Sequence, residues 1–198
     1  MNDLKTEILD AACRAVVRDG LRELSVERVA ADSGVKPDEV HSHFPTLNAL
    51  ITAAFDHADS RATTLVMKGV PEMTAGQRLA YLLTAYLTDD EDIRADWIFW
   101  IEMEAAALFD VEIKGVVSDR ISNWRMTVSS LISVSQTEGS IPAEVDPEAS
   151  GDRLVLIQDA IGRLRAMGIM GEKRALKEMN EAIARELAIQ VPTGDHPA

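Results

Sequence analysis

The sequence predicts an all-helical protein of about nine helices. Apolar residues recur every three or four positions along most of the chain, which is the spacing of amphipathic helices. The alternation typical of strands is scarce, and Gly and Pro residues fall between the periodic stretches, where helices end. With 198 residues, of which 46% are hydrophobic, the chain is long enough to bury a sizeable core in one or two domains.

The composition also limits the classes of function. The net charge of −13 argues against a surface that binds nucleic acid generally. A single cysteine excludes a disulfide framework and fits a reducing cytoplasm. The chain does not open on a basic segment followed by an apolar one, and no run approaches roughly 18 apolar residues. We therefore expect a cytoplasmic protein with no membrane partner.

The first helix is expected over residues 4–19. Leu4, Ile8 and Ala12 share one apolar stripe, and Gly20 can end the helix. Cys13 lies within this helix, where its thiol could serve a redox or metal function. Because the chain has no second cysteine and no histidine nearby at ligand spacing, we expect inert packing instead.

A helix-turn-helix is expected directly afterwards, over residues 25–44. Ser25 is a good N-cap for the first of its two helices. Gly34 can close that helix in the left-handed conformation. Pro37 can begin the second helix, because a residue in the first turn needs no amide donor. In this motif the second helix lies in the major groove of DNA.

Caps and apolar stripes place the remaining helices. Thr74 followed by Gln77 forms a capping box, and the pair Asp146-Pro147 combines a cap with a first-position proline. The acidic residues 89–92 could bind a cation, but carboxylates at a helix start stabilise the helix dipole, and we favour that role. The expected helices cover residues 46–68, from 74 onward, 93–109, 110–139, 147–167 and 172–190.

Residues 5–56 resemble the N-terminal domain of the tetracycline-repressor (TetR) family of bacterial regulators. The matching residues are Ile8, Ala11, Ala12, Gly20, Val29, Ala30, Gly34, Val35, His43, Phe44, Pro45 and Leu50. The resemblance implies an all-helical homodimer that represses transcription from a double-stranded DNA operator and leaves it when a small-molecule effector binds. It also implies a DNA-binding domain at 1–46 and a ligand-binding and dimerisation domain at 47–190. A flexible tail is expected at 191–198.

The candidate DNA contacts lie in and around the helix-turn-helix. They are Ser25, Arg28, Lys36, Pro37, Asp38, Glu39, His41, Ser42 and Thr46. Hydroxyl groups, cations and the backbone amides of helix starts can bind phosphates, and carboxylates can accept a hydrogen bond from cytosine N4. Residues 37–60, however, contain no Lys or Arg.

The charge of this motif departs from the family pattern. Residues 1–60 carry 6 basic and 11 acidic groups. Family members usually have small or hydroxyl residues where Asp38 and Glu39 stand, and Tyr and Lys in place of His41 and Leu47. Because phosphate neutralisation supplies much of the affinity for DNA, we expect weak binding. The alternative is a helical protein of the same fold that has lost DNA binding and acts through a ligand or a protein partner.

No catalytic, metal or cofactor site is expected. The sequence has no glycine-rich phosphate loop, no metal-binding motif, and no Ser or Cys nucleophile with a placed base. His41 and His43 are two residues apart and therefore point to different helix faces, so they do not form a metal pair. We expect a binding protein rather than an enzyme.

The sixth expected helix offers candidate effector-binding residues. Trp97, Trp100 and Glu104 stand at i, i+3 and i+7 and therefore share one face. Met103 on the same helix and Trp124 on the next complete the set, because middle helices enclose the pocket in the resembling family. Indole faces beside a carboxylate suit an organic cation. Alternatively, the tryptophans are ordinary core residues.

The last two long helices carry the stripes of the expected dimer interface. These residues are Leu154, Ile157, Ile161, Leu164, Leu176, Met179, Ile183 and Leu187. Their spacing of three or four residues is typical of helix faces that meet other helices, and the resemblance implies a four-helix interface between two copies. The alternative is that both stripes are buried within one chain, since periodicity does not distinguish the two.

Overall fold

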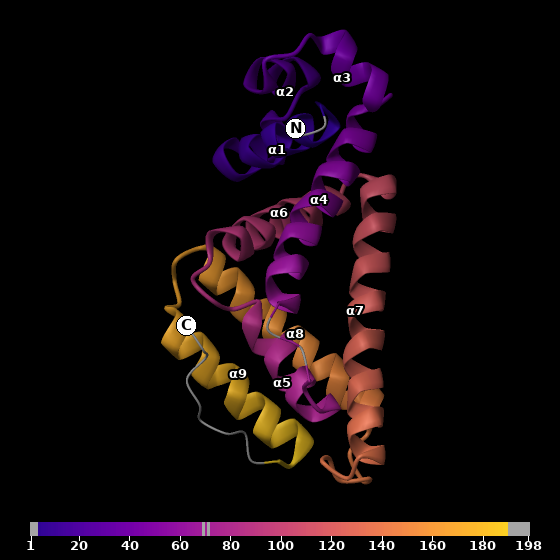
Figure 1. Ribbon diagram of the computed structural model, residues 1–198, viewed down its shortest axis with the longest axis vertical. Coiled ribbons are helices and arrows are strands. Elements are labelled where there is room, and N and C mark those ends of the chain that lie inside the picture. Colours follow the sequence, from indigo (N-terminus) through magenta and orange to yellow (C-terminus); the bar gives the residue numbers. More distant parts are fainter. Residues whose placement is uncertain (1–3, 69, 71, 190–198) are drawn as a thin grey trace. The chain divides into compact units, whose positions relative to one another are not determined.

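The computed structural model describes residues 4–68, 70 and 72–189, and this part of the chain is built from helices (Figure 1). Its elements are α1 (Leu4–Asp19), the 3₁₀ turn η1 (Leu21–Glu23), α2 (Val26–Ser33), α3 (Pro37–His43), α4 (Leu47–Met67), α5 (Ala75–Ala85), α6 (Glu91–Ala107), α7 (Val111–Thr137), α8 (Pro147–Ala166) and α9 (Glu172–Leu187). Nine α-helices without a strand in the described part confirm the predicted fold class. None of the described helices combines the length and apolar character that crossing a membrane requires. The expected tail at 191–198 lies outside the described residues.

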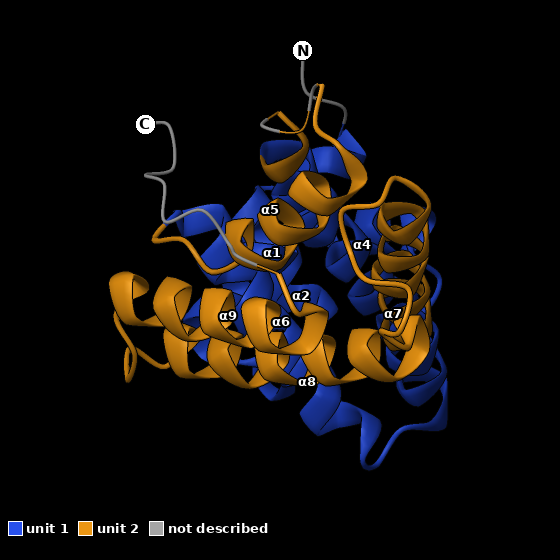
Figure 2. Cartoon of the chain, turned by 90° about the horizontal axis from the view of Figure 1, so that it is seen from below, with its two compact units in different colours: residues 1–65, 90–120 blue, residues 66–89, 121–198 orange. Residues whose placement is uncertain are grey.

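The chain divides into two compact units (Figure 2). Unit 1 consists of residues 1–65 and 90–120, and unit 2 consists of residues 66–89 and 121–198. Helix α6 therefore belongs to the same unit as the helix-turn-helix, whereas α5, α8, α9 and most of α7 form the other unit. The expected functional boundary after residue 46 does not coincide with this division and stays a prediction.

Two glycines with positive φ shape the beginning of unit 1. Gly20 follows α1 with φ 85°, and Gly34 ends α2 with φ 74°, in a backbone region that costs glycine little. Ser25 caps α2 by accepting a hydrogen bond from the backbone N–H of Arg28 at 3.2 Å. Both helix ends lie where the sequence predicts them, because each depends on one or two neighbouring residues.

Helix α1 packs against both α2 and α6 within unit 1. Its side chains with at most 1% of their surface exposed are Ile8, Ala11, Ala12, Ala15 and Val16. Most of these side chains are small, and small side chains let neighbouring helices approach closely. The buried face of α1 therefore holds the helix-turn-helix and α6 around one core.

Aromatic packing joins α4 to α6 in the same core. The ring centroid of Phe55 in α4 lies 5.6 Å from that of Phe99 and 5.7 Å from that of Trp100. The Phe55 and Trp100 rings are nearly parallel, at 24°. Phe99 and Met103 are completely buried, so this face of α6 belongs to the core of unit 1.

Polar contacts also hold α1, α4 and α6 together. Nε2 of His57 in α4 lies 2.8 Å from the carboxylate of Asp10 in α1. Arg61, one turn further along α4, lies 3.5 Å from the same carboxylate and also pairs with Asp92 in the first turn of α6. Three helices that are distant in sequence are thus joined by one network of charges.

The single cysteine has the surroundings of a packing residue. Cys13 is buried in α1, and its thiol donates a hydrogen bond to the backbone carbonyl of Ala54 at 3.2 Å. Burial is the largest cause that raises the pKa of this thiol to about 12. A raised pKa disfavours the reactive thiolate at neutral pH, in agreement with the expected inert packing.

The predicted helix caps are confirmed. Thr74 and Gln77 exchange side-chain to backbone hydrogen bonds of 3.0 and 3.3 Å at the start of α5. Asp146 accepts from two backbone N–H groups at the start of α8, at 3.0 and 3.1 Å. Asp90, which the sequence did not single out as a cap, accepts from two backbone N–H groups at 2.8 and 3.4 Å. Since Asp90 is the cap, α6 begins at Glu91, two residues earlier than expected.

Helices α8 and α9 pack against each other in unit 2, and Arg153 pairs with Glu186 at 2.6 Å. Five of the eight expected dimer-interface residues have at most 5% of their surface exposed, namely Leu154, Ile161, Met179, Ile183 and Leu187. Their placement at a dimer surface is wrong, because their side chains fill the core of a single chain. Ile157, Leu164 and Leu176 are half-buried and keep part of their surface exposed.

A buried amide completes the core of unit 2. Gln158 in α8 is 4% exposed and accepts a hydrogen bond from the indole N–H of Trp124 at 2.7 Å. Its amide nitrogen donates to the carbonyls of Leu82 and Leu83 at 3.3 and 3.1 Å. These carbonyls belong to the last turn of α5, where no further helical N–H is present to bond them. The side chain therefore satisfies a buried helix end.

Candidate nucleic-acid interface and ligand site

Helix α3 is short and largely exposed. Val40 is its one buried residue, and Phe44 directly after the helix is also buried. Pro37 occupies the first helical position, where it costs no hydrogen bond. Anchored in this way, α3 presents most of its circumference to the surroundings, as a helix that enters a DNA groove must.

Helix α2 positions α3 through the turn at Gly34. The N–H of Val35 donates to the Ala30 carbonyl at 3.0 Å, which closes the turn after α2. Helix α2 packs against both α1 and α3, and Val29 and Ala30 provide its buried face. This is the helix-turn-helix connection that the sequence predicts.

The expected cations are only partly available for DNA. Arg28 pairs with Asp19 at 2.8 Å, so its charge is already compensated within the protein. Lys36 is exposed, and its backbone N–H donates to the Glu39 carboxylate at 2.8 Å. Glu39 therefore caps α3 in addition to carrying charge. Asp38 and Glu39 are both exposed, so the start of α3 presents two carboxylates beside one ammonium group.

The other expected contacts also lie on the exposed side of the motif. Ser42 donates to a backbone carbonyl of its own helix at 2.7 Å. Thr46 accepts a backbone N–H at 3.0 Å and thereby caps α4. His41 and His43 are both exposed. In the described part of the chain, no three His, Cys, Asp or Glu side chains are grouped so that they could hold a metal ion.

Lys5 is a candidate DNA contact that the sequence did not indicate. Its Nζ lies 5.8 Å from the ring centroid of Phe44, and the side chain is exposed. Lys5 therefore brings a positive charge to the end of α3. No spacing or motif marks this residue, because only tertiary packing brings the start of α1 to Phe44.

The expected effector-binding residues of α6 divide between two faces. Trp97, Trp100 and Glu104, whose spacing places them on one face of α6, are half-buried. Met103 is completely buried in the core of unit 1 and serves packing. Trp124 belongs to unit 2, where it donates to Gln158 and meets the ring of Tyr86 edge-on, with centroids 5.9 Å apart.

A charged cluster in unit 1 was missed from the sequence. Arg120 in α7 donates to Asp59 in α4 at 2.8 Å, pairs with Asp56, and lies 5.7 Å from the ring centroid of Phe55. Burial and the nearby Asp59 carboxylate raise the pKa of Asp96 in α6 to about 7, although Arg120 opposes this shift. Burial also raises the pKa of Asp59. Two carboxylates thus pair with one guanidinium group beside an aromatic stack, and the charge of this guanidinium also acts on Asp96.

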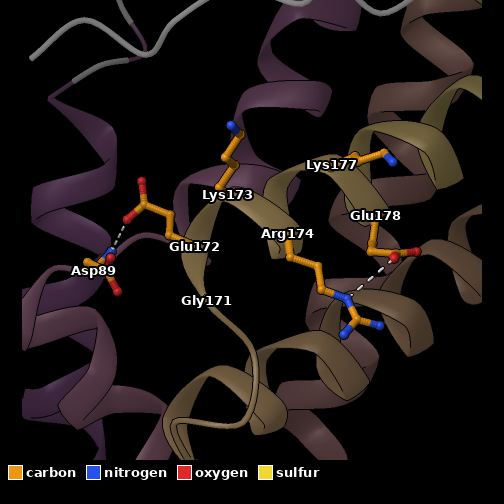
Figure 3. Close-up of a pocket in the computed structure, with 7 residues that line it drawn as sticks. All are labelled: Asp89, Gly171, Glu172, Lys173, Arg174, Lys177 and Glu178. Carbon is orange, nitrogen blue, oxygen red and sulfur yellow. Dashed lines mark hydrogen bonds and ion pairs between the residues drawn. The ribbon is translucent and has the colours of Figure 1, made fainter.

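A shallow groove follows the start of α9 in unit 2 (Figure 3). The groove is lined by Asp89, Gly171, Glu172, Lys173, Arg174, Lys177 and Glu178. Glu172 accepts the backbone N–H of Asp89 at 2.6 Å, and Arg174 pairs with Glu178 at 3.7 Å. The groove is open, and these two carboxylates are engaged within it, so it does not enclose a ligand.

Solved structures match this fold, whereas no protein-family model and no curated protein matched the sequence. A protein from Rhodococcus sp. assigned to the TetR family of transcriptional regulators has a TM-score of 0.85 and 22% identity, covering 94% of this chain and 100% of its own. A TetR transcription regulator from Haloarcula marismortui ATCC 43049 has a TM-score of 0.79 and 23% identity, covering 96% and 99%. A protein from Saccharomonospora viridis, assigned as a transcriptional regulator and solved in complex with choline, has a TM-score of 0.78 and 21% identity, covering 92% and 96%.

These matches extend along nearly the whole of each chain. The protein therefore has the fold of TetR-family transcriptional regulators. At such identities the fold is shared, whereas the DNA sequence, effector and partner surface depend on the residues of this chain.

Removing the two carboxylates at the start of α3 should raise the affinity for DNA. The variant Asp38→Asn with Glu39→Gln removes two negative charges but leaves an amide oxygen that can accept the Lys36 N–H. We expect roughly three- to tenfold tighter binding at low salt, measured by fluorescence anisotropy with a labelled duplex. Adding Leu47→Lys at the exposed start of α4 should steepen the dependence of log affinity on log salt by about 0.9.

The control for this prediction is the pair Asp119→Asn with Glu144→Gln. Both residues are exposed and lie outside the helix-turn-helix, so the pair changes the net charge equally. If the control raises the affinity as much as the α3 variant does, the effect comes from net charge and α3 does not meet DNA.

Asp96 should make the folded state less stable as the pH rises from about 4 to about 7. The folded chain raises the Asp96 pKa from 3.8 to about 7, so it binds this proton more tightly than the unfolded chain does. The stabilisation is fully present below about pH 4 and is lost by about pH 7. Asp96→Asn should remove this dependence and be more stable than the wild type at about pH 8, on the order of a few kcal/mol. Urea denaturation across the pH range measures both effects, and identical pH profiles for the two proteins would contradict them.

Proposed function

We propose that this protein is a DNA-binding transcriptional regulator that acts as a homodimer and releases its operator when a small-molecule effector binds. The observation that carries this proposal is α3, a short exposed helix held on α2 by the turn at Gly34. The fold in which α3 sits is shared with solved transcriptional regulators, which supports the same use of this helix. Repression by occupying the operator is the mode that the resemblance implies.

The DNA contacts divide by chemistry. Lys5, Lys36 and the backbone amides at the helix starts are suited to phosphates, which fix the position of the protein on the duplex. The exposed side chains of α3 are suited to base edges. Among them, Asp38 and Glu39 can accept from cytosine N4 and His41 can donate or accept. The operator should therefore contain cytosine where the start of α3 enters the groove.

A second candidate function is a protein of this fold with little or no DNA binding. Asp38 and Glu39 favour it, because both are exposed where phosphates would approach. The pairing of Arg28 with Asp19 favours it as well, since a compensated cation attracts phosphate weakly. Such a protein would act through its ligand or a protein partner.

The effector class that unit 1 suits best is an organic cation. Trp100 stacks on Phe55, and Arg120 already lies over the Phe55 ring while pairing with carboxylates of α4. Aromatic faces and carboxylates together attract quaternary or protonated amines, with a cation–π contribution of about 0.5–2 kcal/mol. The S. viridis protein of the same fold was solved with choline, a quaternary ammonium compound, which supports this class. Trp97, Glu104 and Trp124 remain candidate effector contacts, because the resemblance to the TetR family implies a ligand pocket among the middle helices.

The dimer contact that we propose is the outer side of the α8 and α9 pair. Leu156 in α8 is 57% exposed, and Ile157, Leu164 and Leu176 are half-buried. These four apolar residues lie on the two helices that the resemblance assigns to the interface, and covering them with a second copy would remove apolar surface from water.

The DNA-binding proposal is tested with duplex DNA from the region upstream of the protein's own coding sequence. Mobility-shift titrations at about 50 mM and about 150 mM salt should show at least roughly tenfold tighter binding than to a shuffled duplex, and binding to both should weaken with salt. No binding to either duplex at the lower salt would refute a role on this DNA and favour the second candidate.

The same complex tests the effector class. Choline chloride should dissociate the protein from the duplex at a concentration at which sodium chloride has no effect. Glu104→Gln or Asp96→Asn should raise the concentration required, because each removes a carboxyl group from the helix that carries Trp97 and Trp100. Release by neutral or acidic compounds but not by choline would exclude the cation.

Leu156→Glu should convert the dimer into a monomer. A glutamate at this exposed position is harmless in an isolated chain but unpaired when buried in an interface. Sedimentation velocity at several concentrations measures the change. The matched control is Met126→Glu on α7, where the side chain is 58% exposed. An unchanged dimer in Leu156→Glu would place the interface elsewhere.

A further inference from the structure

A carboxylate of α6 binds the backbone between α1 and α2. Oε2 of Glu102 accepts a hydrogen bond from the N–H of Leu21 at 2.7 Å. Leu21 opens η1, the single 3₁₀ turn that leads from α1 toward the helix-turn-helix, and is 7% exposed. Without the carboxylate this amide would lose its partner in a place with little access to water, which is costly.

The turn is shaped to receive that carboxylate. Gly20, which precedes η1, has φ 85° and offers no side-chain cap to the turn. A Cβ atom at Gly20 would lie 3.3 Å from the same Oε2 of Glu102, closer than most such contacts. Glycine at this position therefore provides both the backbone conformation and the space that the carboxylate needs.

The segment that Glu102 binds leads directly into the helix-turn-helix. The N–H of Leu24 donates to the Leu21 carbonyl at 3.2 Å, which closes η1. Ser25 follows immediately and caps α2. The position of the Leu21 backbone therefore sets where α2 begins, and α2 in turn carries α3.

Helix α6 is tied to the DNA-binding helices at its other end as well. Asp92 in the first turn of α6 pairs with Arg61, which also contacts Asp10 in α1. That link reaches the middle of α1 and leaves the turn after α1 untouched. Glu102 thus provides a hydrogen bond from α6 to the entrance of the helix-turn-helix.

We propose that Glu102 is a positioning residue for DNA recognition. Its carboxylate, carried by α6, holds the turn at Gly20 and Leu21 and thereby fixes the position of the helix-turn-helix. The expected effect of Glu102 on DNA affinity rests on the proposed function. Its expected effect on the turn at Gly20 and Leu21 does not. Any displacement of α6 along or about its axis withdraws the carboxylate and releases the start of α2. The residue acts through the backbone and touches no DNA.

The test compares Glu102→Ala and Glu102→Gln with the wild-type chain. The amide oxygen of Gln can still accept the Leu21 N–H, but without a charge. Hydrogen exchange at Leu21, followed by mass spectrometry on short peptides, should be roughly tenfold faster in Glu102→Ala and only slightly faster in Glu102→Gln. Exchange in α8 and α9 should not change in either variant.

Affinity for the upstream duplex provides the second readout. Glu102→Ala should bind roughly tenfold more weakly than the wild type, and Glu102→Gln should recover most of that loss. The matched control is Glu91→Ala, which removes an exposed carboxylate from the first turn of the same helix and should change neither readout.

Each result decides the proposal. The proposal is overturned if hydrogen exchange at Leu21 is as slow in Glu102→Ala as in the wild type. It is also overturned if exchange is faster in this variant but its affinity for DNA is unchanged. If Glu102→Ala does not fold, Glu102→Met replaces it, because this side chain keeps a similar length without an oxygen acceptor, and exchange at Leu21 as slow as in the wild type overturns the proposal. If the wild-type chain binds no DNA, the proposed function fails separately, and the exchange comparison alone decides whether Glu102 holds the turn.

Discussion

The close packing of α1 is the constraint on which unit 1 depends. Ala11, Ala12 and Ala15 form much of its buried face, so α2 and α6 can both approach it closely. That approach brings Glu102 within hydrogen-bonding distance of Leu21. A larger side chain on this face would force the helices apart and weaken every contact that positions α3. Helix α3 is therefore placed mainly by the packing of α1 through α2, since Val40 is the one buried residue of α3 itself.

The charges of the helix-turn-helix disfavour DNA binding, whereas the exposed position of α3 favours it. Most of the affinity that is independent of DNA sequence comes from neutralised phosphates, whereas sequence is read through base edges. Arg28 is paired with Asp19, and both Asp38 and Glu39 are exposed. We therefore expect this chain to lose more of the affinity that comes from phosphates than of the affinity that comes from base edges. A low affinity for DNA in general is compatible with useful discrimination, because discrimination depends on the ratio of specific to non-specific binding.

The sequence predicted the helix ends well because each depends on neighbouring residues. Gly34 and Asp146 act as expected, and the whole all-helical pattern follows from such signals. Five of the eight residues of the expected dimer stripe are buried within one chain. Periodicity could not exclude this, because it indicates that a face is buried but not whether its own chain or a partner buries it. Ile161 and Ile183 are buried by their own chain.

The unexpected parts of the candidate site share a different cause. Lys5 meets Phe44, and Glu102 meets Leu21, across long separations in sequence. No spacing rule marks such pairs, because only the packed core brings them together. The raised pKa of Asp96 likewise depends on tertiary packing, first through burial and then through the Asp59 carboxylate of α4.

The arrangement of side chains on α6 limits how strongly an effector could act on DNA binding. Trp100 lies two residues from Glu102 on the same rigid helix, so a ligand that shifts one shifts the other. The ligand can change the equilibrium only by the difference in its affinity for the two positions of α6. Losing a charge-assisted hydrogen bond such as that between Glu102 and Leu21 costs about 1.5–3 kcal/mol, which corresponds to roughly ten- to hundredfold in an equilibrium constant. Allosteric coupling in proteins typically lies in that range, so the loss of this one contact would be enough for a coupling of ordinary size.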